Sequence, residues 1–362
     1  MANNGSSSVL RSNTLFLLLV TASFAVFSAT VAKSPLDVLA PIDTQAAVTR
    51  LVGVGPIDKF AGSFAAVGPW GKILVSGDSG KSWKQSPAPV SSDLNAVSFP
   101  TPKKGWIVGH DGVVLHTDDG GKSWVRQLDG RQYGDIMIRY YESLAQKDNP
   151  KIVRALDDAR RFKEDGADKP FLDVYFENDH SGWVVGSFNL ILKTDDAGKT
   201  WQPWIDRIDN DNAYSLYAIG ASGDEIYIVG ELGLVERLDR QRGSFVQLKT
   251  SYAGSFFGLV TKPNFVLIFG LRGNAFRSRD AGKTWQKVET GLNGGIVSGT
   301  FLEDGRLILG DNTGAIVLSP DDGDHFSRVT IGKLRVLNGI TAVAEKRVLV
   351  VGDGGVSVEI IK

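Results

Sequence analysis

The chain has 362 residues, of which 42 are Gly and none is Cys, and its formal net charge is −1. This near-neutral charge excludes a general electrostatic attraction to nucleic acid or to an anionic membrane surface. The lack of Cys excludes a disulfide framework and thiol chemistry. The Gly excess, with many short Val, Ile and Leu runs, favours an all-β protein with tight turns.

Residues 1–32 are expected to be a secretory signal peptide. Arg11 precedes an apolar run from Leu15 to Phe27, and small residues follow up to Ala32. The run is shorter than the roughly 20 apolar residues of a bilayer span, which favours a cleaved signal over a retained membrane anchor. We therefore expect an exported protein of the periplasm, or of an equivalent lumen. It would be soluble after cleavage, with a single domain over residues 33–362.

An eight-residue box, Ser/Thr-x-Asp-x-Gly-Lys-Ser/Thr-Trp, recurs along the chain. Its clear copies end at Trp83, Trp124, Trp201 and Trp285, a looser copy ends at Phe326, and a worn copy ends at Phe245. Neighbouring box ends are about 40 residues apart, except between Trp124 and Trp201. A period of this length with β patterning is typical of propeller blades of four strands. Six boxed units and a last unit at 337–361 predict seven blades, with six or eight blades as the alternatives.

Each box lies between two β runs, so we predict that it forms the turn between the third and fourth strands of its blade. The Asp would accept backbone N–H hydrogen bonds, the Gly would allow positive φ, and the aromatic residue would pack on the neighbouring sheet. A catalytic or Ca²⁺ site would not recur in this way, and no box collects enough oxygen ligands for Ca²⁺. The residues with these structural roles are Asp78, Gly80, Trp83, Asp119, Gly121, Trp124, Asp196, Gly198, Trp201, Asp280, Gly282, Trp285, Asp321, Gly323 and Phe326.

The last unit stops after three strands and has no box. We predict that the segment from Leu36 to Ile42 supplies its fourth strand, because closing the ring in this way removes free sheet edges.

A helical insert over residues 127–170, between the second and third boxed blades, accounts for the long gap between Trp124 and Trp201. Helical spacing is present over 135–146, and Pro150 suits the start of a second helix that ends near Phe162. We expect the two helices to form a cap over the propeller mouth.

Two interpretations of this insert stay open. It could be a solvated hairpin that only packs its apolar stripe on the propeller, or it could bind a partner. Arginine and tyrosine are enriched at interface hot spots. Strand parity places the insert, the blade-to-blade linkers and the turns after each second strand on the face opposite the boxes. The candidate partner-binding residues are Arg139, Tyr140, Arg154, Arg160, Arg161, Arg207 and Arg272.

The box is the Asp-box (BNR) signature of sialidase-like and related propellers. The fuller pattern, carried by Gly105 to Trp124 and by Gly182 to Trp201, resembles the Ycf48/Hcf136 family of photosystem II assembly factors. The resemblance implies a seven-bladed propeller without enzymatic activity that binds a membrane protein or its assembly intermediate. That complex is photosystem II in photosynthetic relatives, and a transporter-associated complex is the other implied possibility. We expect no cofactor, metal, nucleic acid or small-molecule substrate, and a monomer when the protein is free.

The alternative is a BNR-type glycosidase or carbohydrate-binding propeller. A sialidase needs an arginine triad, a tyrosine nucleophile with a glutamate partner, and an acid. Arg131, Arg207 and Arg272 are scattered over linkers and loops, while Tyr214 and Tyr217 lie near a strand start. Three converging arginines and a Tyr–Glu pair at the mouth would favour this alternative.

Overall fold

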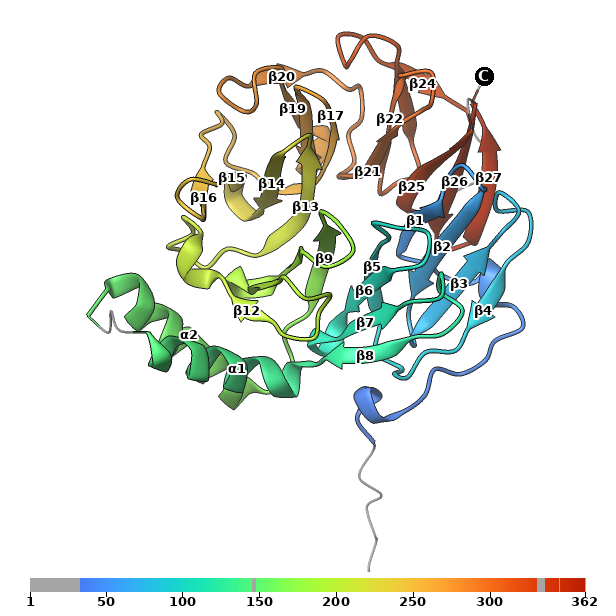
Figure 1. Cartoon of the computed structure of the whole chain (residues 1–362). Helices are drawn as coiled ribbons and strands as arrows, with labels where there is room; N and C mark the ends of the chain where they lie inside the picture. Colours follow the sequence, from blue (N-terminus) through green and yellow to red (C-terminus); the bar gives the residue numbers. More distant parts are fainter. Residues whose placement is uncertain (1–32, 145–147, 331–335, 345, 362) are drawn as a thin grey trace, which may run out of the picture. The chain divides into compact units, whose positions relative to one another are not determined.

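Seven antiparallel sheets follow one another along the chain and stand in a ring (Figure 1). The computed structural model describes residues 33–144, 148–330, 336–344 and 346–361, so the predicted signal peptide lies outside the described residues. Residues 34–362 form one unit. The predicted seven-bladed all-β propeller is confirmed.

Each of the first six blades has four strands in sequence order, and the first strand of each lines the centre of the ring. Blade one consists of β1 (Gly53–Asp58), β2 (Ser63–Gly68), β3 (Lys72–Ser76) and β4 (Lys84–Ser86). Blade two consists of β5 (Leu94–Ser98), β6 (Gly105–Gly109), β7 (Val114–Thr117) and β8 (Val125–Leu128). Blade three consists of β9 (Phe171–Phe176), β10 (Gly182–Gly186), β11 (Ile191–Thr194) and β12 (Gln202–Pro203). Blade four consists of β13 (Leu216–Ser222), β14 (Glu225–Gly230), β15 (Val235–Asp239) and β16 (Ser244–Gln247). Blade five consists of β17 (Phe256–Lys262), β18 (Phe265–Gly270), β19 (Ala275–Ser278) and β20 (Gln286–Val288). Blade six consists of β21 (Ile296–Phe301), β22 (Leu307–Asp311), β23 (Ile316–Ser319) and β24 (Ser327–Val329).

The second strand of each blade is the buried centre of its sheet. In β6 and β10 the sequence Gly-Trp-Ile/Val-Val-Gly is buried at every position. Trp106 of β6 stacks on Phe176 of β9 in the next blade, with ring centroids 3.6 Å apart. Such contacts between faces of neighbouring blades make the core of a propeller continuous around the ring.

The seventh blade corrects the predicted closure. Within the described residues it has three strands, β25 (Leu337–Ala344), β26 (Arg347–Gly352) and β27 (Gly355–Ile360). The segment from Leu36 to Ile42 does not pair with them, so that prediction was wrong. Pro35 opens a short 3₁₀ turn, Leu36 is buried in the apolar cluster of blades one and two, and the backbone N–H of Ala40 donates to Ala88 O at 3.2 Å. Pro35 and Pro41 also lack the N–H groups that a strand ladder needs.

Hydrogen bonds from blade seven to the segment just before β1 close the ring instead. Asn338 Nδ2 donates to Leu51 O at 2.7 Å, and Leu51 N donates to Gly352 O at 3.0 Å, which joins blade seven to blade one. Asn95 Nδ2 donates in the same way to Phe171 O at 2.8 Å between blades two and three. The seam between the first and last blades therefore uses the same device as an ordinary blade boundary.

Two helices, α1 (Gly130–Ser143) and α2 (Pro150–Asp165), form the predicted insert between blades two and three. The helix α1 begins five residues earlier than its periodicity indicated, because Asp129 and Gln132 form a capping box. The helix α1 contacts β12 and the short turn His110–Gly112 of blade two, and α2 contacts the short turn Ile205–Arg207 after β12. Both helices stand at the rim of the ring (Figure 1). The expected cap over the mouth was therefore wrong.

Gly130 and Gly134 allow the close fit of α1 against α2 and the segment that follows it. A Cβ atom at Gly134 would lie 2.7 Å from Lys163 Cα, and one at Gly130 would lie 2.6 Å from Ala167 Cα. The first and last residues of the insert thus touch each other. No helix of the described residues is long and apolar enough to cross a membrane.

Candidate binding surface

The box carboxylates make their hydrogen bonds inside their own turns. In the second box, Asp119 accepts from Thr117 Oγ1 at 2.7 Å, Ser123 N at 3.0 Å and Ser123 Oγ at 2.6 Å. The same pattern recurs at Asp78, Asp196 and Asp280, and His325 Nδ1 takes the place of the last hydroxyl at Asp321. Among the described residues, no group of three His, Asp or Glu side chains is placed to hold a metal ion.

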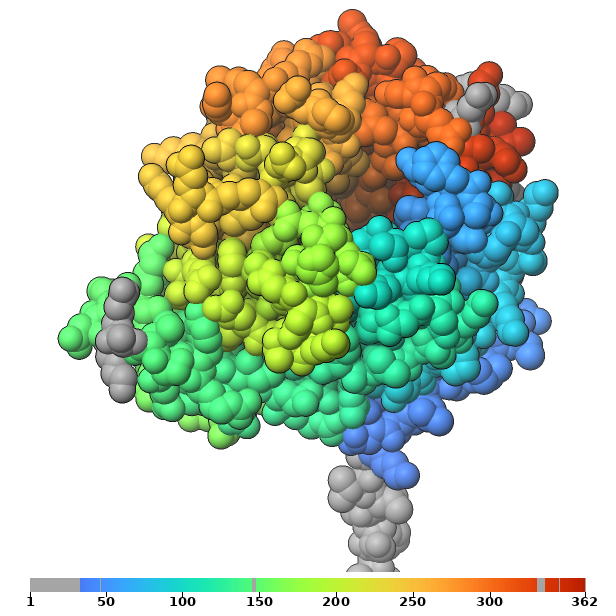
Figure 2. Space-filling model, viewed as in Figure 1, coloured from blue at the N-terminus to red at the C-terminus, as the bar shows by residue number. Residues whose placement is uncertain are grey.

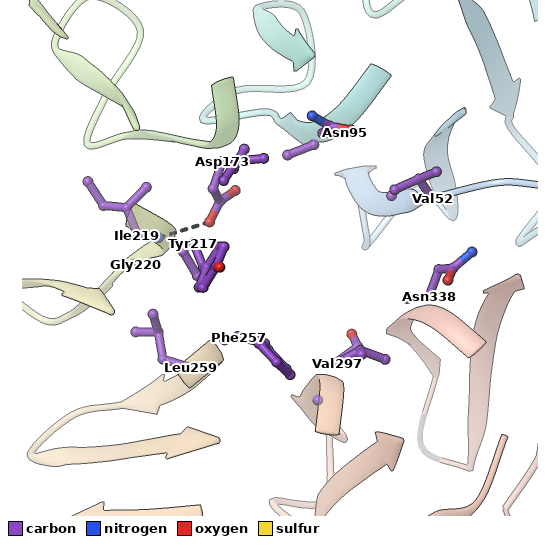
Figure 3. Close-up of a pocket in the computed structure, with 18 of the residues that line it drawn as sticks. Val52, Asn95, Asp173, Tyr217, Ile219, Gly220, Phe257, Leu259, Val297 and Asn338 are labelled. Atoms are coloured by element: carbon purple, nitrogen blue, oxygen red, sulfur yellow. Dashed lines mark hydrogen bonds between the residues drawn. The ribbon is translucent and has the colours of Figure 1, made fainter. Parts of the chain in front are cut away.

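The centre of the ring contains a cavity of about 290 Å³ lined by the first strand of every blade (Figure 3). Asp173 of β9 is the one carboxylate among the described residues that line it, and its oxygens accept from Ile219 N at 2.9 Å and Val174 N at 2.8 Å. Burial raises the pKa of Asp173 to about 7, and these two hydrogen bonds oppose the rise only in part. The channel therefore gains a negative charge near neutral pH.

The glycosidase alternative can be compared with the mouth of this channel. Tyr217 lines the cavity, and its hydroxyl donates to Glu231 Oε1 at 3.1 Å, so one Tyr–Glu pair is present. Burial, and then the Glu231 carboxylate, raises the pKa of Tyr217 to about 12, which keeps the phenol protonated. No arginine is among the described residues that line the cavity. Arg131 instead pairs with Asp37 and Asp129 beside the start of α1.

The structure brings six of the seven predicted partner-binding residues together at the hairpin. Tyr140 of α1 accepts hydrogen bonds from Gln202 Nε2 at 2.7 Å and from Arg207 Nη2 at 2.8 Å, which ties the hairpin to blade three. Arg139 is exposed and pairs with no carboxylate of the described residues within 4.0 Å. The other arginines form ion pairs: Arg154 with Asp211, Arg160 with Asp157 and Glu142, and Arg161 with Asp158.

A groove of about 540 Å³ runs between the two helices near their exposed end. Ile152, Val153 and Leu156 give it an apolar floor, and Glu142, Asp157 and Arg160 line its edge. The apolar side chain of Val153 on α2 is 45% exposed to solvent. The hairpin therefore offers apolar surface with charges beside it, which is the composition of a protein interface.

Arg272 is apart from the hairpin, in the turn between the second and third strands of blade five. The corresponding turns of blades one to five share one geometry. An N–H three residues on closes each turn, and both central residues have positive φ. The first central residues are Trp70, Asp111, Phe188, Leu232 and Arg272, with φ between 50° and 61°. This is a type I′ turn, in which Asn-Gly or Asp-Gly is favoured.

The sequence placed these turns on one face and marked Arg272 as a candidate, but the large apolar side chains of the other turns were not predicted as binding residues. Trp70 is 67% exposed, Phe188 is 56% exposed and Leu232 is 58% exposed. The available signal was the residue pair itself: a two-residue turn with Trp-Gly, Phe-Asn or Leu-Gly where Asp-Gly would fit best.

Comparisons with known proteins agree with the fold and locate the insert. The family model described as photosynthesis system II assembly factor YCF48 matches residues 59–137 and 164–308. A photosystem II assembly lipoprotein Ycf48 of Synechococcus sp. (strain CC9902) is 25% identical over 247 residues, which cover 67% of this chain and 63% of that relative. The match therefore spans less than two thirds of the relative's length.

Solved structures of other proteins have a similar fold. A structure described as YCF48 bound to D1 peptide superposes with a TM-score of 0.60 at 16% identity, covering 92% of this chain and 98% of that one. The WD40 propeller domain of Doa1 gives a TM-score of 0.62 at 9% identity, covering 91% and 96%. Similarity at this level shows the fold alone. The family model is interrupted at residues 138–163, so most of the hairpin lies outside the part that the model matches.

Proposed function

We propose a function for this chain from its family, because the chain belongs to the Ycf48 family of photosystem II assembly factors. In this proposal it is a non-catalytic, exported scaffold that holds a subunit of a membrane complex while the complex is assembled. The relative solved with a D1 peptide supports a polypeptide segment of such a subunit as the bound group.

The observation that carries the proposal is the hairpin groove. The propeller is shared with proteins of unrelated function, so the ring alone does not define a partner. The hairpin interrupts the family match and stands at the rim of the ring (Figure 2). It exposes an apolar groove that Arg160 lines at its edge. Arg160 at the groove would recognise an acidic side chain next to apolar ones, and Arg139 is a further exposed cation on α1.

A non-catalytic role is consistent with the rest of the surface. The box carboxylates are occupied by their own turns, and the one Tyr–Glu pair at the channel has no arginine triad beside it. We therefore do not favour the glycosidase or lectin alternative.

The test removes the hairpin and keeps the ring. Residues 131–168 are deleted, and Gly130 is joined to Lys169 through a short glycine linker, which the contact of Gly130 with Ala167 allows. We expect the variant to keep the β-sheet circular dichroism of the parent. Its affinity for a fluorescently labelled D1 peptide should fall at least about tenfold, which corresponds to ~1.4 kcal/mol.

A point variant gives the matched comparison. Val153→Ser lowers the apolar area of the groove, whereas Val125→Ser changes an exposed Val of β8 that does not line it. Val153→Ser should weaken peptide binding and Val125→Ser should not. Unchanged binding by the deletion variant would overturn the role of the hairpin.

A further inference from the structure

The large side chains at the type I′ turns are unusual, because elsewhere in this molecule the turn residues with a similar positive φ have small side chains or none. The box turns also contain a non-terminal position with positive φ, and it is occupied by Ser79, Gly120, Ala197, Ala281 and Asp322. On the opposite face the equivalent φ is adopted by Trp70, Phe188, Leu232 and Arg272. Left-handed backbone is strained for such side chains and persists where function requires it.

Burial does not compensate for this strain. Phe188 and Leu232 are more than half exposed, and Leu271, directly before Arg272, is 39% exposed. A bulky apolar side chain that strains its own turn and then faces solvent adds little to folding beyond contacts such as the Lys169 ammonium 5.4 Å from the centre of the Phe188 ring. It contributes to binding if a partner covers it.

Phe188, Leu232, Leu271 and Arg272 belong to consecutive blades three, four and five, and we name them the tip arc. One end of the arc adjoins the hairpin: Phe188 shares a cavity of about 220 Å³ with Arg161 and Phe162 of α2. The middle borders the channel mouth, because Glu231, next to Leu232, holds Tyr217. The other end carries Arg272, which has no carboxylate partner within 4.0 Å among the described residues.

The charges of the arc indicate its occupant. Glu231 is engaged by Tyr217 Oη and Ser215 N, and Lys169 beside Phe188 is engaged by Asp165 and Asp168, so Arg272 is the available charge. The same face carries Asp111 on blade two, and on blade seven it carries Asp353, which pairs with Arg50 at 3.7 Å. A flat anionic membrane would meet the Asp111 carboxylate as well, whereas a narrow chain could follow the arc alone.

We propose that the tip arc binds an extended segment of the partner polypeptide in which apolar side chains precede a carboxylate. Phe188, Leu232 and Leu271 take the apolar side chains, and Arg272 pairs with the carboxylate. This proposal rests on the proposed function and adds a second contact surface, continuous with the hairpin, for the same partner.

The test uses substitutions that suit the turn and remove the apolar contact. Asn tolerates positive φ, so the double variant Phe188→Asn/Leu232→Asn should melt at the same temperature as the parent or higher. The probes are three labelled decapeptides: one alternates Leu and Ser and ends in a free carboxylate, one is its amidated twin, and one has Ser in place of every Leu. We expect the parent to prefer the first peptide, and the double variant to bind it at least about tenfold more weakly.

Two further variants complete the experiment: one is the control, and the other tests the pairing of Arg272 with a carboxylate. Trp70→Asn makes the same change in blade one, outside the arc, and should leave peptide binding unchanged. Arg272→Gln should reduce the preference for the free carboxylate over the amide and so tests the proposal independently of the double variant. Equal peptide affinity in the parent, the double variant and Arg272→Gln would overturn it.

Other occupants would give other results. If the double variant loses binding to phosphatidylglycerol vesicles and keeps peptide binding, the arc binds lipid and the proposal is wrong. If it changes only the sedimentation of the free protein, the arc joins two copies of the chain, and the proposal is again wrong. If the double variant binds the D1 peptide with the affinity of the parent while the hairpin deletion does not, the tip arc proposal is wrong and the proposed function stands.

Discussion

Asp119 and Asp173 carry the same carboxyl group, but their surroundings shift its pKa in opposite directions. Burial alone would raise the pKa of Asp119, but hydrogen bonds from Ser123 and Thr117 outweigh it and hold the pKa at about 2. Such a group stabilises the fold above its unfolded pKa of about 4, and this stability is lost as the pH falls through about 2. Asp173 accepts only two backbone N–H groups inside the channel, so burial dominates and its pKa is about 7.

Asp173→Asn is predicted to remove one component of the pH dependence of stability. Between about pH 4 and pH 7 the unfolded chain has an ionised Asp173 and the folded chain a protonated one, so protons are released on unfolding. The free energy of unfolding therefore falls as the pH rises, by at most ~1.4 kcal/mol per unit from this group. Urea unfolding of the parent and the variant across that range should show a steeper fall in the parent.

The box aspartates do not obscure this comparison, because their effect has the opposite sign and lies mainly below pH 4. Asp211→Asn changes an exposed carboxylate of a linker and is the matched control. Parallel curves for the parent and Asp173→Asn would show that Asp173 ionises normally in the folded protein.

At the scale of elements, periodicity predicted the blades and the hairpin but not where the hairpin lies. The boxes repeat a local turn whose hydrogen bonds are internal, so spacing alone located the strands on either side of each box. The start of α1 was missed because Gly130 and Gly134 read as turn residues, whereas they are required by the contact with α2. Of the tip residues only Arg272 was predicted; Phe188, Leu232 and Leu271 were missed because the strain of these turns appears only in the backbone angles.

Gly134→Ala is predicted to destabilise the protein, the reverse of the usual effect of alanine in a helix. Alanine normally improves a helical position by about 1 kcal/mol over glycine. Here its Cβ would lie 2.7 Å from Lys163 Cα and 2.8 Å from Lys163 N, so α1 and α2 would have to separate. Thermal unfolding should show a lower melting temperature, with a loss of about 1–3 kcal/mol.

Gly77→Ala is the control, because nothing lies within 4 Å of a Cβ at that position and its φ is not positive. It should leave the melting temperature nearly unchanged. A stabilised Gly134→Ala variant would mean that the two helices are not in close contact.

The whole molecule is a ring whose last sheet has one strand fewer than the others among the described residues. The sequence indicated the missing strand, but the choice of Leu36 to Ile42 to replace it assumed that a propeller closes by strand exchange. Pro35, Pro41 and the burial of Leu36 direct that segment to blades one and two. Closure thus depends on Asn338, Leu51 and the apolar packing between blades seven and one.

Asn338→Ala is therefore predicted to loosen the seam more than Asn95→Ala loosens an ordinary boundary. Each variant removes one side-chain donor of 2.7–2.8 Å to the next blade, worth about 1 kcal/mol. The boundary at Asn95 also has the stacked Trp106 and Phe176 rings. Hydrogen exchange should accelerate across β25–β27 in Asn338→Ala and change little across β9–β12 in Asn95→Ala. Equal acceleration in both variants would contradict a weaker seam.

The contact between Gly130 and Ala167 has a consequence for how such a protein can diversify. Because the insert leaves and re-enters the ring at one point, its length and sequence can vary without moving any blade. The ring then supplies the fold, and the hairpin can change to suit a different partner without altering the ring. A hairpin transplanted between relatives at this point would be expected to transfer partner choice while the recipient's fold is retained.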